Sequence, residues 1–471
     1  MATAQLYPSL KTVLVKLSEE LVESIQSRWA GDWSQQVPRV GVHFNYWDVK
    51  ALPSFNAASA ELKRIPLVSD KYSEDSLDKP LVAFLELVVG SLPHPSFLPK
   101  AIEHWWKPFA LFLTATELPI RLFVGLSNFE ADRPLYRLDH ENAICFYGDG
   151  SLGGVIERSV NPPSPEPFPS TGLPMHMIHG AIEVDFSLPA NQNNLQYGHY
   201  SHDCIHRMLP LKNALRLSTF GRLVVGPWIP LCNPSFPVDG VYAIGSPEEG
   251  SRFSEPLFRL DDPAWQRFEE VYRHLKQIQD ENGKDIEQNR AIRRRFASAI
   301  SRFIDTFEQG YWESVVVDLV IVMESLLTPN KQGGRMQLAL AASNLVGNDP
   351  MEAREVFDNV TAMYRLRNQN VHGEPTTQET WDARILEIAR AAGSSATSLD
   401  DGIREYAFEV MRDYARRTIV SMLNLYYDAS YPPSEELTSH LHRLHLDKTL
   451  RQFIRSAAKA NPLAERPSPP R

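Results

Sequence analysis

The sequence predicts a multidomain α+β protein, in which a β-rich mixed N-terminal region is followed by an all-α helical bundle. Three observations predict this division. The chain has 471 residues, and single hydrophobic cores usually stop growing near about 250–300 residues. Short apolar segments bounded by Gly, Pro, Asn or Asp fill the first half. From about residue 262, apolar residues recur at helical spacing instead.

Residues 1–255 are expected to form a β-rich sensor or recognition region, as one body or as two lobes, with an unknown ligand. The prolines of 161–174 predict a loop or hinge, because proline can neither join a strand ladder nor continue a helix. The segments with strand character are 119–129, 142–148, 181–189, 215–231 and 240–245, and helical patterns stand among them at 81–92 and 101–113.

The C-terminal half is expected to be helical. A linking helix is predicted within 256–285, where Asp262-Pro263 starts a pattern that ends at Asn282-Gly283. A helical bundle should fill 286–430, and 431–471 should hold one more helix and then a disordered tail. The helix over 311–327 is apolar nearly all round, which predicts a central place. The bundle helices are expected at 286–309, 311–327, 335–347, 350–373 and 403–428.

Composition narrows the class of protein. Hydrophobic residues make up 43% and charged residues 23%, as in ordinary soluble globular proteins. The longest apolar run is interrupted by Asp318 and Glu324 and is shorter than the roughly 20 residues that span a bilayer. The N-terminus shows no secretory signal. We therefore expect no membrane partner.

Three widely spaced cysteines, Cys145, Cys204 and Cys232, do not predict a disulfide framework, so a cytoplasmic location is expected. The net charge of −10 argues against a broad basic surface that coats nucleic acid. It leaves room for a small, local phosphate site.

The segment MYRLRNQNVHGEP, residues 363–375, is the strongest candidate for chemistry. On a helix Asn368 and His372 are four positions apart and stack on one face. Arg365 lies three positions before Asn368 and shares that face. Arg367 lies about 100° away around the helix, yet its long side chain can swing toward the same place.

Gly373 and Pro375 should end this helix, which leaves His372 in its last turn. A helix C-terminus is negative and favours a protonated imidazole. The same pattern is also an ordinary polar helix end, in which these side chains only cap and solvate the helix. Spacing by itself leaves both interpretations open.

The segment RLRNQNVHGE resembles the signature of the HEPN superfamily, in which an Arg and a polar residue are followed by three to five residues and a His. Its flanks resemble the Apea-like branch. AIRRRFASAISRF (291–303), DLVIVMESLLTP (318–329) and YRLRNQNVHG (364–373) stand in the order of three blocks of that branch. The resemblance covers about residues 285–430. One departure is Ala341, where the branch often has an arginine.

The resemblance implies a HEPN-like bundle that acts as a homodimer and as a metal-independent endoribonuclease without a cofactor. The RNA 2′-hydroxyl would attack the adjacent phosphate, giving 2′,3′-cyclic phosphate and 5′-hydroxyl ends. His372 suits the general acid/base, Arg367 the phosphate clamp and Asn368 the orienting group, with Arg365 as a second clamp. The substrate would be tRNA or mRNA, and the role would be microbial antiphage defence or toxin action.

Two charged features near this motif allow two interpretations each. Glu324 is costly to bury without a partner, so it either pairs with Arg365 or Arg367 or sits at the solvent end of its helix. The run Arg293–Arg295 either guides RNA or forms a solvated helix face, since consecutive residues point in different directions.

A competing site is the cluster His199, His202, Cys204 and His206, near His176 and His179. These residue types bind zinc, but their spacing matches no familiar zinc motif, and no metal is expected. A metal-dependent hydrolase centred on this cluster is one alternative function. The other is a non-catalytic HEPN module that binds RNA, nucleotide or protein. No P-loop, dinucleotide fingerprint or GxSxG motif occurs.

Overall fold

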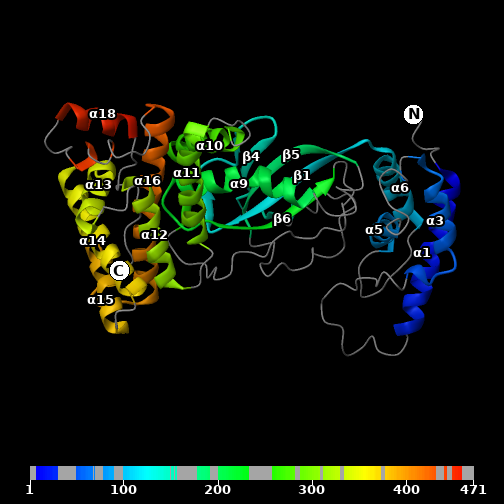
Figure 1. Ribbon diagram of the computed structural model, residues 1–471. Helices are drawn as coiled ribbons and strands as arrows, with labels where there is room; N and C mark the ends of the chain where they lie inside the picture. The colour runs from blue at the N-terminus through cyan, green and yellow to red at the C-terminus, as the bar shows by residue number, and fades with distance from the viewer. Residues whose placement is uncertain are drawn as a thin grey trace. The chain divides into compact units, whose positions relative to one another are not determined.

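The structure is a computed structural model (Figure 1). It describes residues 7–29, 49–66, 68, 78–89, 99–148, 150–152, 154–155, 178–190, 200–232, 257–281, 287–307, 311–328, 334–372, 377–430, 437, 440–442 and 448–458. The predicted loop 161–174, the predicted strand 240–245 and the predicted disordered end of the tail lie outside these residues.

The chain divides into two compact units that are not continuous in sequence. The first comprises Met1–Ser127, Arg133–Met208 and Val225–Pro247, and the second comprises Asn128–Asp132, Leu209–Val224 and Glu248–Arg471. A single boundary near residue 255 does not describe this division, because two short segments of the N-terminal half pack into the C-terminal unit. Each unit is described by itself below.

The first unit begins with helices rather than strands. Its first four named helices pack on one another through buried residues such as Leu14, Phe84 and Phe109, and Lys11 pairs with Glu103 at 2.6 Å. The description of 1–255 as β-rich is therefore too broad, since the described residues before 115 are mainly helical. These helices are α1 (Pro8–Trp29), α3 (Phe55–Lys63), α5 (Asp78–Val89) and α6 (Pro99–Thr114).

A five-stranded sheet follows, with strand order β3-β4-β5-β1-β6. Strand β5 pairs antiparallel with β1 and β4, and β4 pairs antiparallel with β3. Four of these strands fall on segments with predicted strand character. The strands are β1 (Glu117–Ser127), β3 (Leu135–Arg137), β4 (Asn142–Phe146), β5 (Gly180–Pro189) and β6 (Val224–Cys232).

One face of this sheet is apolar and the other carries charges. Ile182 and Val184 are buried on one side of β5, while Asp185 pairs with Arg121 of β1 on the other at 2.7 and 2.9 Å. Such alternation is typical of an antiparallel sheet with one face on a core. A Cβ on Gly125 would lie 2.7 Å from the carbonyl oxygen of Gly226, so β1 and β6 meet where only glycine fits.

Helix α9 (Tyr200–Ser218) corrects the predicted strand over 215–231. The helix continues to Ser218, because Leu211, Ala214 and Leu215 keep helical spacing and are buried. Only the later part of the predicted segment, from Val224, is a strand. The two prolines of β6 suit its place at the edge of the sheet order.

The second unit is mainly helical and contains a two-stranded parallel sheet, β2 (Phe129–Ala131) with β7 (Phe258–Leu260). The predicted helices are present within a few residues of their expected bounds. A helix over 378–391 was missed, although Thr377 caps it and buried Trp381, Ile385 and Ile388 mark its apolar face. The helices are α10 (Asp262–Glu281), α11 (Glu287–Asp305), α12 (Trp312–Leu327), α13 (Arg335–Val346), α14 (Pro350–His372), α15 (Gln378–Ala391), α16 (Asp401–Tyr427) and α18 (Lys448–Ala458).

Helix α12 has an inner place in this unit, since it contacts α11, α13, α14 and α16 and buries residues such as Leu319 and Met323. Helix α16 is more enclosed still. It contacts α10–α15 and α18, and nearly all its side chains between Ile403 and Leu425 are buried. Apolar composition did not indicate this role of α16, because its buried charges pair with one another and with neighbouring helices.

Among the described residues, no helix is long and apolar enough to cross a membrane.

Candidate functional site

Helix α14 places the 363–372 segment at its C-terminal end. Asp349 caps the helix start, where its Oδ1 accepts hydrogen bonds from the backbone N–H groups of Met351 and Glu352 at 2.8 and 2.9 Å. Pro350 occupies the first helical position, where a missing N–H costs nothing. The helix is described as far as His372, and the helix end predicted from Gly373 and Pro375 lies outside the described residues.

One face of α14 is anchored in the bundle. The side chains of Val356, Val360, Met363 and Leu366 are fully buried, as their spacing predicted. This orientation turns the polar residues of the motif toward the other side of the helix. Arg365 is exposed, and Arg367 and Asn368 are half-buried.

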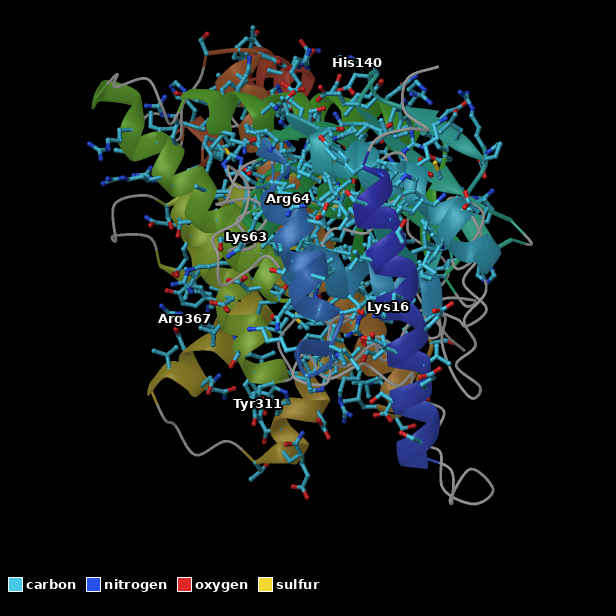
Figure 2. The ribbon with its side chains drawn as sticks, turned by 90° about the vertical axis from the view of Figure 1, so that its right-hand side faces the viewer. Lys16, Lys63, Arg64, His140, Tyr311 and Arg367 are labelled. Atoms are coloured by element: carbon cyan, nitrogen blue, oxygen red, sulfur yellow. The ribbon has the colours of Figure 1, made fainter. Side chains whose placement is uncertain are left out.

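Arg367 lies in a polar environment built from two helices (Figure 2 labels its position). Its Nη2 lies 3.7 Å from Oε2 of Glu324 on α12, and its Nη1 donates a hydrogen bond to Oδ1 of Asn368 at 2.9 Å. Glu324 thus pairs with Arg367, one of the two arginines considered. The Arg367 and Glu324 side chains are 22% and 23% exposed, so solvent still reaches both.

Tyr364 completes this group. The guanidinium carbon of Arg367 lies 5.7 Å from the centroid of the Tyr364 ring, within the range of a cation–π contact. Burial raises the pKa of Tyr364, and the negative charge of the Glu324 carboxylate raises it further. The phenol therefore keeps its proton at neutral pH.

The arrangement leaves Arg367 able to bind an anion. A guanidinium has five N–H donors, and Asn368 accepts from one of them. The contact with Glu324 is longer than a hydrogen bond and partly solvated, so it stabilises the side chain by about 1 kcal/mol or less. A phosphate group can therefore compete for the remaining donors.

The structure gives no side-chain contact for His372, because its side chain lies outside the described atoms. Its backbone position is the last of α14, five residues after Arg367. Arg365, Asn368 and His372 share a helix face by spacing. The structure thus brings Arg367, Asn368 and Glu324 together and adds Tyr364, which sequence reasoning did not select.

The arginine run on α11 does not form one basic surface. Arg293 is buried, Arg294 is exposed and Arg295 is half-buried. Burial lowers the pKa of Arg295. Of the two interpretations, a continuous track that guides RNA has less support, because the three side chains differ in their access to solvent.

The histidine and cysteine cluster is not gathered into one site by its described members. On α9, Cys204 is fully buried while His206, two positions later, is exposed. Burial is the main reason that the pKa of Cys204 is raised to about 12. A raised pKa disfavours the thiolate, which is the form that binds metals. His199 and the His202 side chain lie outside the described atoms. Among the described residues, no group of three or more His, Cys, Asp or Glu side chains can hold a metal ion.

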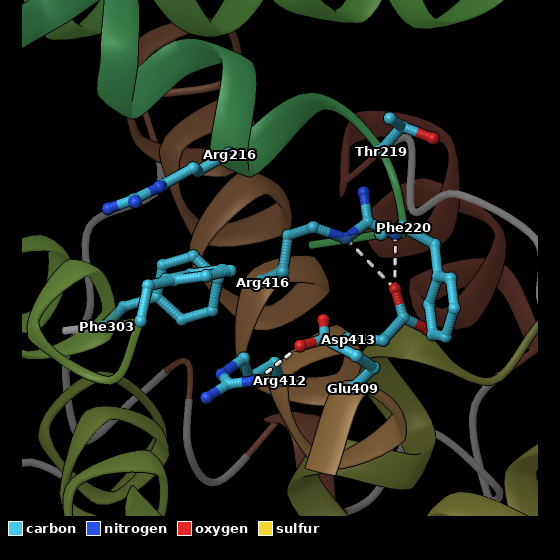
Figure 3. A pocket seen from close by; sticks show the side chains of 10 residues that line it. Arg216, Thr219, Phe220, Phe303, Glu409, Arg412, Asp413 and Arg416 are labelled. Carbon is cyan, nitrogen blue, oxygen red and sulfur yellow. Dashed lines mark hydrogen bonds and ion pairs between the residues drawn. The ribbon is translucent and has the colours of Figure 1, made fainter. Parts of the chain in front are cut away.

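A second charged cluster lies along α16, and sequence reasoning missed it (Figure 3). Arg412 pairs with Glu409, and Arg416 pairs with Asp413. All four side chains are at most 4% exposed. Their spacing of three residues on one helix was the signal that could have shown these pairs.

The ring of Phe307 contacts Arg412 and one further cation, Arg216. The guanidinium carbons of Arg216 and Arg412 lie 4.5 and 4.9 Å from its centroid. The cavity that these side chains line has a volume of about 10 Å³, close to the space of one water molecule. It has no room for a nucleotide, so we assign this cluster to packing of the bundle.

No family model, characterised protein or solved structure matches this chain.

Proposed function

We propose that residues 286–430 form a HEPN-type bundle that cleaves RNA without a metal ion. The observation that supports this most directly is the setting of Arg367. Its guanidinium is held by Glu324 and Asn368, and its side chain is partly exposed to solvent. It lies five residues before a histidine that ends the same helix. A fork of donors and an acid/base group are the two parts that transesterification of RNA requires.

The reaction follows from these groups. His372 removes the proton of the RNA 2′-hydroxyl, and the 2′-oxygen attacks the adjacent phosphorus. The bond to the 5′-oxygen breaks, and that oxygen takes a proton from an imidazolium. Arg367 binds the non-bridging oxygens and stabilises the charge that grows on them. The products are a 2′,3′-cyclic phosphate and a 5′-hydroxyl, and no metal takes part.

A dimer would bring together the two side chains, Arg367 and His372, that one helix holds apart. Five positions on a helix separate Arg367 and His372 by about 140°, so the two side chains diverge within one chain. Two copies of α14 that meet across a two-fold axis would place Arg367 of one subunit near the histidine of the other. The N-terminal unit would then serve as the sensor that controls the bundle, in antiphage defence or toxin action.

The test is cleavage of total RNA and purified tRNA by the full-length chain in the presence of EDTA. We expect cyclic-phosphate ends from the wild type and loss of cleavage in Arg367→Ala/His372→Ala. The matched control is Arg354→Ala/His140→Ala, which changes the same residue types at side chains that are 85% and 90% exposed. The control should cleave like the wild type.

Other outcomes favour the alternatives. RNA binding without cleavage under any condition supports a non-catalytic binding module. Cleavage that EDTA abolishes, and that the Arg367→Ala/His372→Ala variant retains, supports a metal-dependent hydrolase built on His199–His206. Cleavage that the control double variant also loses contradicts the assignment to α14.

Mixing two inactive variants tests the dimer. If each site takes Arg367 from one subunit and His372 from the other, Arg367→Ala mixed with His372→Ala should recover about a quarter of the wild-type activity. Half of the dimers are then mixed, and each mixed dimer has one intact site. Absence of recovery, with dimers present by light scattering, contradicts a site shared in this way.

A further inference from the structure

Tyr364 lies against the guanidinium of Arg367. It precedes Arg367 by three residues on α14, so the two side chains lie on neighbouring parts of the helix surface. The centroid of its ring lies 5.7 Å from the guanidinium carbon. On the α12 side, Oε2 of Glu324 lies 3.7 Å from Nη2 of Arg367. Arg367 thus has an aromatic ring from its own helix and a carboxylate from α12 as neighbours.

These neighbours limit the motion of the guanidinium. The aromatic ring lies against it, and Glu324 attracts Nη2. Asn368 accepts from Nη1. An arginine held in this way loses less freedom when it binds a phosphate, and this preorganisation lowers the barrier of the reaction.

We propose that Tyr364 is a positioning residue of the α14 site, which holds the Arg367 fork in place through its aromatic ring. This inference rests on the proposed function. Tyr364 is not itself the acid or base, because its pKa lies above the ordinary value and the proton stays on the phenol at neutral pH. Its effect on catalysis therefore passes through Arg367.

Two substitutions separate the ring from the phenol. Tyr364→Phe keeps the ring and its volume, so kcat for RNA cleavage should stay within about threefold of the wild type. Tyr364→Leu removes the ring, and kcat should fall about 10–100-fold. A loss in Tyr364→Phe as large as in Tyr364→Leu contradicts a role of the ring. KM should change less than about threefold in both variants, because orientation acts mainly in the transition state.

The matched control is Tyr311, which is 78% exposed at the start of α12, the helix that carries Glu324. It lies thirteen positions before Glu324, about 20 Å along the helix, and Figure 2 labels it. Tyr311→Phe and Tyr311→Leu should leave kcat and KM within about twofold. Circular dichroism and Tm establish that each variant folds, and Tyr364→Phe retains the packing if Tyr364→Leu does not fold.

The deciding measurement is a double-mutant cycle with Arg367→Ala. If Tyr364 acts through Arg367, then Tyr364→Leu should change the residual activity of Arg367→Ala by less than about twofold. A loss in that background as large as in the wild type overturns the inference and leaves the proposed function standing. A kcat of Tyr364→Leu equal to that of the wild type also overturns the inference and leaves the proposed function standing.

Binding of a 2′-O-methyl RNA, which lacks the attacking hydroxyl, separates this inference from the proposed function. If the wild type binds this RNA but cleaves no RNA, cleavage is wrong, and the same cycle on Kd decides the role of Tyr364. Coupling of Tyr364 to Arg367 in Kd then supports the inference, and independent effects overturn it. A wild type that neither cleaves nor binds RNA overturns both proposals.

Discussion

At the scale of single residues, the α14 site depends on how a half-buried arginine is held. Arg367 has a carboxylate, an amide and an aromatic ring as neighbours, and each restrains a different part of the guanidinium. A planar fork and a point charge should therefore behave differently at this position, even though both are cationic.

Arg367→Lys tests this difference. Lysine keeps the positive charge but loses the planar fork, so we expect cleavage to fall about 10²–10³-fold, while the affinity for RNA changes less than about tenfold. Single-turnover cleavage and fluorescence anisotropy measure the two quantities. Arg354→Lys, at the exposed start of the same helix, should change neither. An equal loss of binding and cleavage in Arg367→Lys contradicts the role of the fork.

His274 is a buried titratable residue outside the proposed site. It is 1% exposed, and its Nε2 lies 3.2 Å from Oδ1 of Asp428. Its ring stacks on Tyr427. Burial lowers the pKa of His274, and the hydrogen bond that its Nε2 donates to Asp428 opposes this effect only in part. The folded chain therefore binds a proton at this residue less readily than the unfolded chain does.

This shift gives a pH dependence of stability with a defined sign. Because the unfolded histidine titrates near about 6.5, the unfolded state binds more protons just below that pH. The free energy of unfolding should be independent of His274 above this range and should fall as pH drops through it. Urea unfolding between pH 8 and pH 5 measures the effect. His274→Gln should flatten the slope, and an unchanged slope contradicts the assignment.

At the scale of elements, the bundle is organised around a helix rich in charge. Arg417 of α16 is fully buried, pairs with Glu352 of α14 at 2.7 Å and donates a hydrogen bond to the carbonyl oxygen of Val346 at the end of α13. One side chain thus ties three helices together. Such buried pairs contribute little net stability when intact, but breaking one is costly.

The junction of α13 and α14 also depends on a close backbone approach. A Cβ on Gly347 would lie 2.6 Å from both the Cα of Ala353 and the carbonyl oxygen of Ser343. Backbone atoms cannot move aside as a flexible side chain can. Glycine is required here because there is no space for a side chain. The backbone conformation does not require it, since a φ of −76° is open to any residue.

Gly347→Ala should therefore destabilise the chain by about 1–3 kcal/mol, and chemical denaturation should show an earlier midpoint. Gly402→Ala, in the first turn of α16, is the matched control. The nearest atom to a Cβ there is Asp400 Oδ1 at 3.5 Å, an ordinary contact, and alanine favours the helix. The control should be neutral or stabilising, and a similar loss in both variants contradicts the steric argument.

At the scale of the whole molecule, the C-terminal unit recruits two segments from the N-terminal half. Strand β2 pairs with β7, and Phe129 stacks on Phe258. From the segment 209–224, Arg222 pairs with Glu405 of α16 at 3.0 Å. The helical unit is therefore incomplete if the chain is cut where its composition changes.

A fragment of residues 256–471 should accordingly be less stable than the same unit in the full chain. It lacks the partner strand of β7 and leaves the buried Phe258 without its stacking neighbour. We expect a lower Tm and faster proteolysis of α10 and α16, measured by calorimetry and by mass spectrometry of the digests. A fragment as stable and as resistant as the full chain contradicts the discontinuous unit.

The sequence predicted much of the local structure of the candidate site. The predicted helix over 350–373 agrees with the start of α14 at Pro350, and the apolar spacing of Val356 to Leu366 gave its buried face. The ion pair of Glu324 was one of two open options. Tyr364 was not selected, because a tyrosine on a helix carries no signal until its neighbours from another helix are known.

Taken by itself, the sequence determined where most helices begin and end, because caps, breakers and apolar period act over a few neighbouring residues. Only the tertiary structure decided that the charged α16 is central, that Glu324 meets Arg367, and that residues 128–132 and 209–224 belong with the helical unit. Those features depend on which faces meet in space, and charges that pair across helices look the same in sequence as charges that face water.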